Sequence, residues 1–334
     1  MLKEIELKLQ IHPKDVKQLL ELDCLKSNQK DTFVLKNTYF DTVETILANH
    51  KIALRIRQKG SRYIQTLKTQ GENHGGLHIR SEYENDLRGY ELELGLIEAP
   101  LNQLLTDHTL SDLELLPIFS TDFTRHEIQL NAMEFVLDQG CVTYKNLKDQ
   151  ICEVELELKV DASIDFSQKH HIQLIFQLAQ KIAQNISVMP SDTSKALRGE
   201  RLKLLEQGKK YQVNFEKIPE KSTIQQKVAC FLQFIQSNWE AFYFLKQTAY
   251  LASAIDAIGS LLDLLKQQQN TYYAHMKIPL QAIIDKWRKL LIECKPSLNE
   301  VQLNQLIDSI FQDKEIGQIW LSMSMWCHLG GNHE

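Results

Sequence analysis

The residues best suited to chemistry stand at the start of the chain, where apolar and charged side chains alternate over residues 1–8. Successive side chains of a strand point to opposite faces, so Glu4, Glu6 and Lys8 would share one face. Ile5 and Leu7 would lie on the other face. Two neighbouring carboxylates can bind a divalent metal ion, and an ammonium group can bind an anion. Taken alone, however, such a stretch is more often the solvated face of an ordinary strand.

The alternation recurs in later segments, with charges of both signs. Arg55 and Arg57 alternate with apolar residues, and so do Glu153, Glu155 and Glu157. Solvated faces usually include Ser, Thr and Gln, whereas a closed sheet with a charged interior needs ordered rows of charge. The ligand that rows of acids and rows of bases can share is a metal-bound polyphosphate.

Hydrolysis of a triphosphate requires cations that hold its negative charges, a metal ion that neutralises its oxygens and a water molecule aimed in line. Mg²⁺ and Mn²⁺ prefer carboxylate oxygens. Guanidinium groups can make bidentate contacts with phosphate. The candidate metal ligands are the pairs Glu4 and Glu6, and Glu153 and Glu155. The candidate phosphate ligands are Lys8, Arg55, Arg57, Lys68 and Arg125.

These residues resemble the CYTH family, the triphosphate tunnel metalloenzymes. The Glu-x-Glu-x-Lys stretch at 4–8 opens a series of matching segments that covers roughly residues 1–205 in order. The later segments are 39–42, 53–57, 66–68, 76–82, 119–125, 137–140, 152–158 and 194–199. The resemblance implies an α+β fold, in which an eight-stranded antiparallel β-barrel with flanking helices forms a charged tunnel.

The resemblance also implies roles for individual residues. Glu4, Glu6 and Lys8 would act in catalysis, and Glu82 and Asp138 would orient water or metal. The implied metal ligands are Glu4, Glu6, Glu153 and Glu155. The implied triphosphate ligands are Lys8, Arg55, Arg57, Lys68, Arg80, Arg125 and Lys195. The role of Glu157, one strand period past the usual pair, stays open.

The implied activity is metal-dependent hydrolysis of inorganic triphosphate to pyrophosphate and phosphate, with Mg²⁺ or Mn²⁺ as the cofactor. The matching segments are closest to bacterial inorganic triphosphatases that carry a C-terminal CHAD domain. Other activities remain open on the same fold: a thiamine triphosphatase, a nucleoside triphosphatase or a class IV-type adenylate cyclase. The remaining alternative is a module that binds polyphosphate or a nucleotide without turnover.

We expect a tunnel domain over 1–207, a linker over 208–220 and a helical domain over 221–334. In the last segment apolar residues recur at intervals of three and four, which is typical of amphipathic helices. Breaks near Asn270, Pro296 and Asp313 predict four or five helices. The segment is shorter than a CHAD domain and has Arg288 as its only arginine. It therefore predicts a shortened or diverged CHAD-like bundle for self-association or protein docking.

The net charge of −5 and the charged fraction of 24% do not indicate a nucleic-acid-binding protein. The six cysteines include no C-x-x-C pair, which favours free thiols in a reducing compartment. Charged residues at the N-terminus argue against a signal peptide. Lys246 and Asp256 interrupt the most apolar stretch, around 242–262. We therefore expect a cytoplasmic protein that spans no membrane.

Several local patterns in the tunnel domain predict individual elements. The glycine-rich stretch 71–76 predicts a mobile loop, residues 87–115 show a helical pattern, and Gly140 predicts a tight turn between two strands. Apolar periodicity predicts a helix over 170–183, and the stretch Thr193-Ser194-Lys195 is typical of a helix start.

Overall fold

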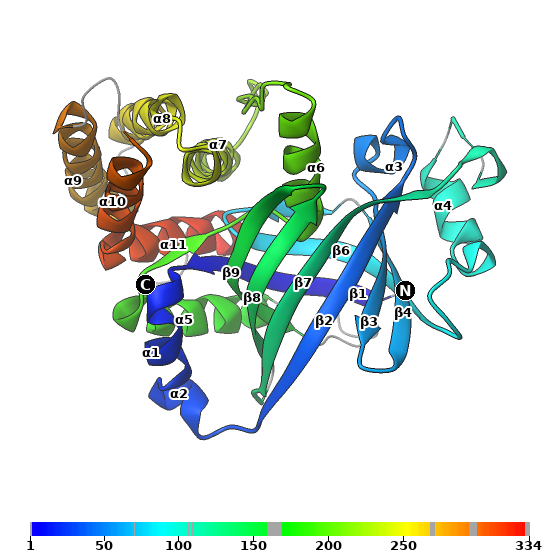
Figure 1. Cartoon of the computed structure of the whole chain (residues 1–334). Coiled ribbons are helices and arrows are strands. Elements are labelled where there is room, and N and C mark those ends of the chain that lie inside the picture. The colour runs from blue at the N-terminus through cyan, green and yellow to red at the C-terminus, as the bar shows by residue number, and fades with distance from the viewer. Residues whose placement is uncertain are drawn as a thin grey trace.

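The centre of the molecule is a closed antiparallel β-barrel (Figure 1). A computed structural model of the chain describes residues 2–69, 71–105, 107, 108, 110–131, 133–158, 169–267, 271–293 and 299–330. The barrel strands are β1 (Leu2–Ile11), β2 (Lys30–Asp41), β3 (Ala53–Lys59), β4 (Arg62–Lys68), β6 (Leu77–Leu87), β7 (Leu116–Gln129), β8 (Glu134–Tyr144) and β9 (Leu147–Leu158). They follow one another in the order β1–β9–β8–β7–β2–β3–β4–β6, and β6 closes the ring by pairing with β1. The predicted α+β fold with an eight-stranded barrel is confirmed.

The barrel strands turn their apolar faces outward, toward helices, and their charged faces inward. Leu7 of β1 is fully buried in the same apolar cluster as Phe176 of α5 (Lys169–Asn185). Burial of such side chains stabilises the fold by roughly 25 cal/mol per Å² of apolar surface. Because side chains alternate along a strand, packing Leu7 outside sends Glu6 and Lys8 into the interior.

The remaining helices of the barrel part are short, apart from α6. They are α1 (Val16–Leu20), α2 (Asp23–Lys26), α3 (Ile46–Asn49), α4 (Glu98–Leu104) and α6 (Lys195–Glu206), with single 3-10 turns at Pro13–Asp15, Leu94–Leu96 and Leu110–Asp112. Ser194 caps α6, since its side-chain oxygen accepts a hydrogen bond from the amide of Leu197 at 3.1 Å. The predicted helix start at Lys195 is therefore confirmed, and it brings Lys195 against β8 and β9.

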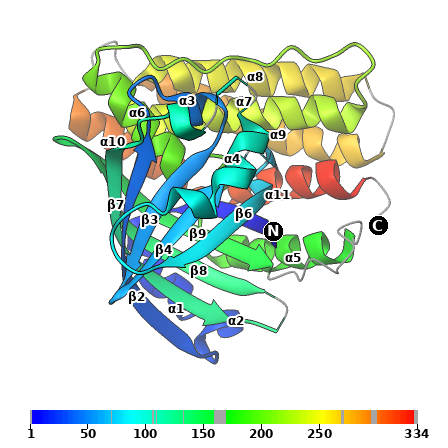
Figure 2. The same ribbon diagram turned by 90° about the vertical axis from the view of Figure 1, so that its right-hand side faces the viewer.

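The C-terminal part is a helical bundle packed against the barrel. It consists of α7 (Ile224–Leu245), α8 (Thr248–Lys266), α9 (Thr271–Glu293), α10 (Glu300–Phe311) and α11 (Lys314–Leu329). Helices α7, α8 and α9 lie side by side above the barrel (Figure 2). Trp239, Trp287 and Trp320 are buried in the bundle core. Of the expected helix breaks, Asp313 precedes α11, whereas Asn270 and Pro296 lie outside the described residues.

The bundle and the barrel share an apolar interface. Leu321 of α11 belongs to the apolar cluster outside the barrel, and Met189 of the short strand β10 (Val188–Pro190) belongs to the bundle core. Helix α11 approaches so closely that a Cβ atom on Gly317 would lie 2.1 Å from the carbonyl oxygen of Val188. The division into a domain over 1–207, a linker over 208–220 and a domain over 221–334 therefore stays a prediction.

Helix α8 is long and apolar enough in composition to cross a membrane, whereas the sequence predicted no membrane span in this stretch. Its most apolar window has a mean hydropathy of 1.3 and is 44% buried inside the protein. Leu251, Ile258 and Leu261 pack into the core of the bundle. A core helix of a soluble protein has the same properties, so α8 is weak evidence for a membrane span.

The predicted turn at Gly140 is wrong. Strand β8 continues through Gly140, and the chain turns instead at Lys145, whose φ angle is 50°. Gly140 lies opposite Phe123, and a Cβ atom there would lie 2.2 Å from the carbonyl oxygen of Asp122. A glycine is thus needed here because two strands approach each other closely, and not because the chain turns.

Two other local predictions were also wrong. Within 71–76 the chain forms the short strand β5 (Glu72–His74), which pairs with β6 through a turn in which Gly75 and Gly76 have positive φ angles. Of residues 87–115, the structure assigns only α4 and two 3-10 turns to helix. Leucines in this stretch instead cover the outside of β3 and β4. An apolar spacing of three or four can serve irregular packing as well as a helix.

Candidate functional site

A cavity of about 290 Å³ occupies the interior of the barrel. All eight barrel strands and the start of α6 contribute side chains to it, and most of these side chains are charged. Of the predicted site residues, those on its wall are Glu4, Lys8, Arg55, Arg57, Lys68, Arg80, Glu82, Arg125, Glu155 and Lys195. The structure therefore brings acids and bases from distant parts of the sequence around one space.

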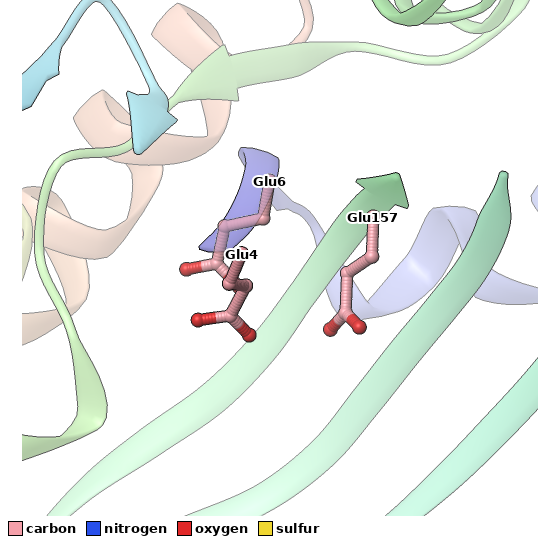
Figure 3. A group of neighbouring side chains, drawn as sticks. All are labelled: Glu4, Glu6 and Glu157. Atoms are coloured by element: carbon pink, nitrogen blue, oxygen red, sulfur yellow. The ribbon is translucent and has the colours of Figure 1, made fainter. Parts of the chain in front are cut away.

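The first acid cluster joins Glu4 and Glu6 of β1 with Glu157 of β9. One carboxylate oxygen from each lies within 4.8 Å of the others. Figure 3 shows the three side chains extending to the same side of their strands. The pairing of Glu6 opposite Glu157 explains the grouping, because directly opposed residues share a face. Glu157, whose role the sequence left open, thus stands beside the N-terminal pair.

The second acid cluster consists of Asp138, Glu153 and Glu155, whose carboxylate oxygens also lie within 4.8 Å of one another. The ammonium group of Lys195 reaches into it, at 2.6 Å from Asp138 and from Glu153 and 3.0 Å from Glu155. Arg125 adds ion pairs of 2.8 Å to Asp138 and Glu155. The four predicted metal ligands are therefore divided between two clusters, and Lys195 and Arg125 neutralise the second.

The carboxylates of the first cluster differ in their surroundings. Burial disfavours the charge of Glu4, but Lys68 and Arg80, at 2.8 and 3.0 Å, outweigh it and hold its pKa well below the usual range. Burial raises the pKa of Glu157 well above its usual range, because Arg125 at 3.9 Å offsets little and Glu155 adds repulsion. Among the described residues Glu157 thus has only this long ion pair with Arg125, which leaves its oxygens accessible to a divalent metal ion.

Arg57 on the cavity wall forms no ion pair with the described residues. Burial and the neighbouring guanidinium groups of Arg55 and Arg125 lower the pKa of Arg57 to about 10. Its Nε atom donates a hydrogen bond to Asn37 Oδ1 at 3.0 Å, and it makes no ion pair with any carboxylate of the described residues. Burying a guanidinium group without a counter-charge is costly, so this wall is suited to a polyanion.

Glu82 lies on the cavity wall and contacts both Lys68 and Arg55. Its carboxylate is 3.2 Å from Lys68 and 3.7 Å from Arg55, and burial nevertheless raises its pKa. Asp138 is different, since its burial is outweighed by Arg125 and Lys195, which lower its pKa. The family resemblance implies one shared role for these two acids, but only Glu82 of the two lies on the cavity wall.

Two further residues support or line the cavity and were not predicted from the sequence. Arg198 is buried and lies 3.2 Å from both Asp149 and Glu153, so it supports the second acid cluster from α6. Its position three residues after Lys195, on the same helix face, was the available signal. Tyr39 lies on the wall beside Arg55, and nothing in its strand pattern separated it from a core tyrosine.

A second cavity of about 330 Å³ adjoins the first. Tyr39, Lys68 and Arg80 line both spaces, so the two are neighbours on the same wall. The second cavity is more apolar, with Phe40 and Phe119 among its lining residues. An aromatic group attached to a phosphate chain could therefore lie beside the charged cavity.

Known proteins are similar to this chain in sequence and in structure. Residues 2–184 match the CYTH domain. Over 206 residues the chain is 35% identical to the inorganic triphosphatase of Haemophilus influenzae, which covers 60% of this chain and 54% of that protein. The chain spans about half the length of the curated relatives it matches.

Two solved structures are also similar. A Hippeastrum protein described as having a dominant triphosphatase activity gives a TM-score of 0.40 at 20% identity, over 62% of this chain and 97% of that chain. The protein PH1819 from Pyrococcus horikoshii gives a TM-score of 0.39 at 14% identity, over 62% of this chain and 99% of that chain.

Proposed function

Because the chain belongs to the CYTH domain family, we propose that it hydrolyses inorganic triphosphate to pyrophosphate and phosphate inside the barrel. The observation that carries the proposal is the charge arrangement of the cavity. Arg57, which forms no ion pair within the described part of the chain, faces the same space as Glu4 and Glu157, two of the three glutamates of the first acid cluster. A polyanion bound together with a divalent cation would balance both.

The cationic side chains would hold the phosphate oxygens. Arg55, Arg57 and Arg125 offer planar groups for bidentate contacts, and Lys68 and Lys195 offer point charges. The full proposed set of triphosphate ligands is Lys8, Arg55, Arg57, Lys68, Arg80, Arg125 and Lys195. Because the walls are rigid strands, these charges are positioned before the substrate arrives, which lowers the cost of stabilising charge in the transition state.

Glu4, Glu6 and Glu157 would hold the metal ion, for which we propose Mg²⁺ or Mn²⁺ because all the donor atoms are oxygens. When bound, the ion would neutralise phosphate oxygens and polarise the terminal phosphoryl group. Glu153 and Glu155 contact Lys195 in the same way as Glu4 and Glu6 contact Arg80, so we keep this second pair as proposed metal ligands too.

We propose Glu82 as the acid that orients the attacking water and accepts its proton. Its raised pKa and its place on the cavity wall support this role. Asp138 would instead hold Arg125 and Lys195 in place, since both of its oxygens contact these cations. Both residues therefore stay in the site, with different functions.

A second candidate function is hydrolysis of an organic triphosphate, such as thiamine triphosphate or a nucleoside triphosphate. The adjoining cavity with its aromatic side chains favours it, because that space could receive the organic group. Adenylate cyclase activity would use the same space for adenosine. A module that binds without turnover is the remaining alternative.

The deciding experiment measures phosphate release from inorganic triphosphate, thiamine triphosphate and ATP in parallel, with Mg²⁺ and separately with Mn²⁺. We expect strong preference for inorganic triphosphate and complete loss of release with a chelator. Preference for an organic substrate would favour the second function, and cyclic AMP formed from ATP would indicate a cyclase. Tight triphosphate binding without any release would indicate a binding module.

Substitution of the acid cluster tests the metal assignment. Glu4→Gln, Glu6→Gln and Glu157→Gln should each abolish turnover, because an amide offers a weaker metal ligand, while circular dichroism shows an intact fold. Near-normal activity in Glu6→Gln would contradict the assignment. Activity lost in Glu4→Gln and Glu6→Gln but kept in Glu157→Gln would remove Glu157 from the metal site.

We also propose a cellular location and partners for the protein. Five cysteines are free thiols in the structure, and Cys294 lies outside the described residues, so we propose a reducing, cytoplasmic location. We propose that the protein binds neither nucleic acid nor a membrane. For the helical segment we propose a partial CHAD-like module that self-associates or docks another protein.

A further inference from the structure

A buried glutamate joins the helical bundle to the barrel. Glu240 lies in α7, outside the residues that match the CYTH domain, and its side chain is 7% exposed. Its carboxylate accepts hydrogen bonds from the hydroxyl groups of Ser191 and Thr193. Arg201 of α6 supplies a counter-charge at 3.3 Å and also donates to the Thr193 hydroxyl at 2.7 Å.

The residues that Glu240 holds form the connection from β10 to α6. This connection is also tied to the barrel, because the amide of Ser191 donates to the carbonyl oxygen of Lys8 at 2.9 Å. Asp192 accepts a hydrogen bond from the amide of Gly76 at 2.8 Å. The segment is thus held from the barrel through its backbone and Asp192, and from the bundle through its hydroxyl groups.

Lys195 follows this segment directly. Its ammonium group enters the barrel at 2.6 Å from Asp138 and Glu153, where it lies on the wall of the charged cavity. A shift of the hydroxyl-bearing segment would move the first turn of α6, and with it Lys195. Geometry of this kind is sensitive, since displacement of a binding group by about 1 Å can cost a large factor in rate.

We propose that Glu240 is a positioning residue that sets the place of Lys195 in the substrate cavity, so that the helical bundle controls the affinity for triphosphate. The inference rests on the proposed function, because Lys195 is assigned there to triphosphate binding. Removal of Glu240 would leave two hydroxyl groups and the Arg201 guanidinium without their buried acceptor. Such groups reorganise to find new partners, which displaces the segment.

The first test measures KM and kcat for inorganic triphosphate in Glu240→Ala and Glu240→Gln. We expect KM to rise about tenfold in Glu240→Ala, with kcat changed by less than about threefold, because a misplaced binding group weakens binding first. Glu240→Gln should fall between wild type and Glu240→Ala, since its amide oxygen still accepts one hydrogen bond. Thr193→Val removes the partner hydroxyl from the barrel side and should raise KM in the same way.

A matched control separates positioning from general stability. Ile284 is buried in the bundle core. Ile284→Ala should lower the thermal midpoint yet leave KM unchanged, because it leaves the carboxylate of Glu240 in place. If Ile284→Ala raises KM as much as Glu240→Ala, the effect belongs to the stability of the bundle and the inference is overturned.

A double-mutant cycle with Lys195→Ala shows whether Glu240 acts through Lys195. We expect Glu240→Ala to add less than about twofold to the KM of Lys195→Ala, since a group that is already absent cannot be misplaced. Additive effects would overturn the inference. If the wild-type protein neither hydrolyses nor binds triphosphate, the proposed function fails; if it does and KM is unchanged in both Glu240→Ala and Thr193→Val, only the inference fails.

Discussion

At the scale of single residues, the same side-chain type has different properties at two neighbouring positions of one cavity wall. Burial disfavours the charge of Arg125, but Asp138 and Glu155, both at 2.8 Å, outweigh this cost and raise its pKa. Arg57 has Asn37 as its hydrogen-bond partner and a lowered pKa. Arg125 therefore also positions Asp138 and Glu155, whereas Arg57, which forms no ion pair with the described residues, has a charge that a bound ligand could balance.

Arg57→Ala tests this distinction directly. Loss of the guanidinium should raise KM for triphosphate by about tenfold or more and change kcat less, because the group would bind substrate and transition state alike. Steady-state kinetics with inorganic triphosphate measures both constants. The control is Arg62→Ala, which removes an exposed guanidinium from β4 that pairs with Asp86 at the surface and should leave KM unchanged. An unchanged KM in Arg57→Ala would remove Arg57 from the substrate site.

At the scale of elements, close approach of strands and loops decides what the barrel tolerates. Gly140 permits β8 to run tightly against Phe123, and Gly76 supplies the amide that binds Asp192. Neither contact can be seen in the periodicity of its own segment, because each depends on a partner elsewhere in the chain.

Gly140→Ala should destabilise the protein. The added methyl group would clash with the Asp122 carbonyl oxygen and the Phe123 Cα atom. Both are backbone atoms of a strand in a closed barrel, so they cannot easily move away. We expect the free energy of unfolding to fall by about 1–3 kcal/mol in urea titrations, as for other overpacked sites. Gly89→Ala is the matched control, because no heavy atom lies within 4 Å of the position that its methyl group would take and stability should hold.

Asp192 should make stability depend on pH. Burial, with the charge of Glu240, raises the pKa of Asp192 to about 7 from its ordinary value of 3.8. Between these values the folded protein keeps a proton that the unfolded chain releases, so this carboxyl group contributes stability at low pH that is lost as pH rises toward 7. Asp192→Asn keeps an oxygen for the Gly76 amide and cannot ionise.

The measurement compares urea unfolding of Asp192→Asn and wild type at pH 5, 6, 7 and 8. The difference in free energy of unfolding should shift in favour of the variant as pH rises and then level off above about pH 7. Other titrating groups are common to both proteins and cancel in the difference. A difference that stays constant with pH would show that Asp192 is ionised throughout.

At the scale of the whole molecule, the barrel and the helical bundle share buried surface. Met189 and Leu321 each pack in the apolar cluster of the other part, and Trp239 of α7 donates a hydrogen bond to Gln10 of β1 at 3.3 Å. An interface of this kind should couple the unfolding of the two parts.

Tryptophan fluorescence can measure that coupling, because all four tryptophans lie in the bundle: Trp239, Trp287, Trp320 and Trp326. Triphosphate at a hundred times its Kd should stabilise the folded state by about 2.7 kcal/mol and raise the midpoint of the fluorescence-detected thermal transition. The ligand would bind only the barrel, so a shift in the bundle signal requires coupling. A fluorescence transition that stays in place while the barrel transition moves would show independent unfolding.

The sequence alone determined the barrel and the direction in which its side chains point. Alternation is a local property, so rows such as Glu4, Glu6 and Lys8 predict a charged face wherever the strand lies. The resemblance to a known family then supplied the number of strands and the cavity. The helical nature of 221–334 also followed from local periodicity, and the structure bears both out.

Only the tertiary structure decided which charges meet. The register between β1 and β9 places Glu157, rather than Glu153 or Glu155, opposite Glu6. Packing of α7 brings Glu240 to Ser191 and Thr193 across about fifty residues of sequence. Gly140 is needed not for a turn but because β7 leaves no room for a side chain there. Register and packing depend on partners that are distant in sequence, and no local pattern of residue types encodes them.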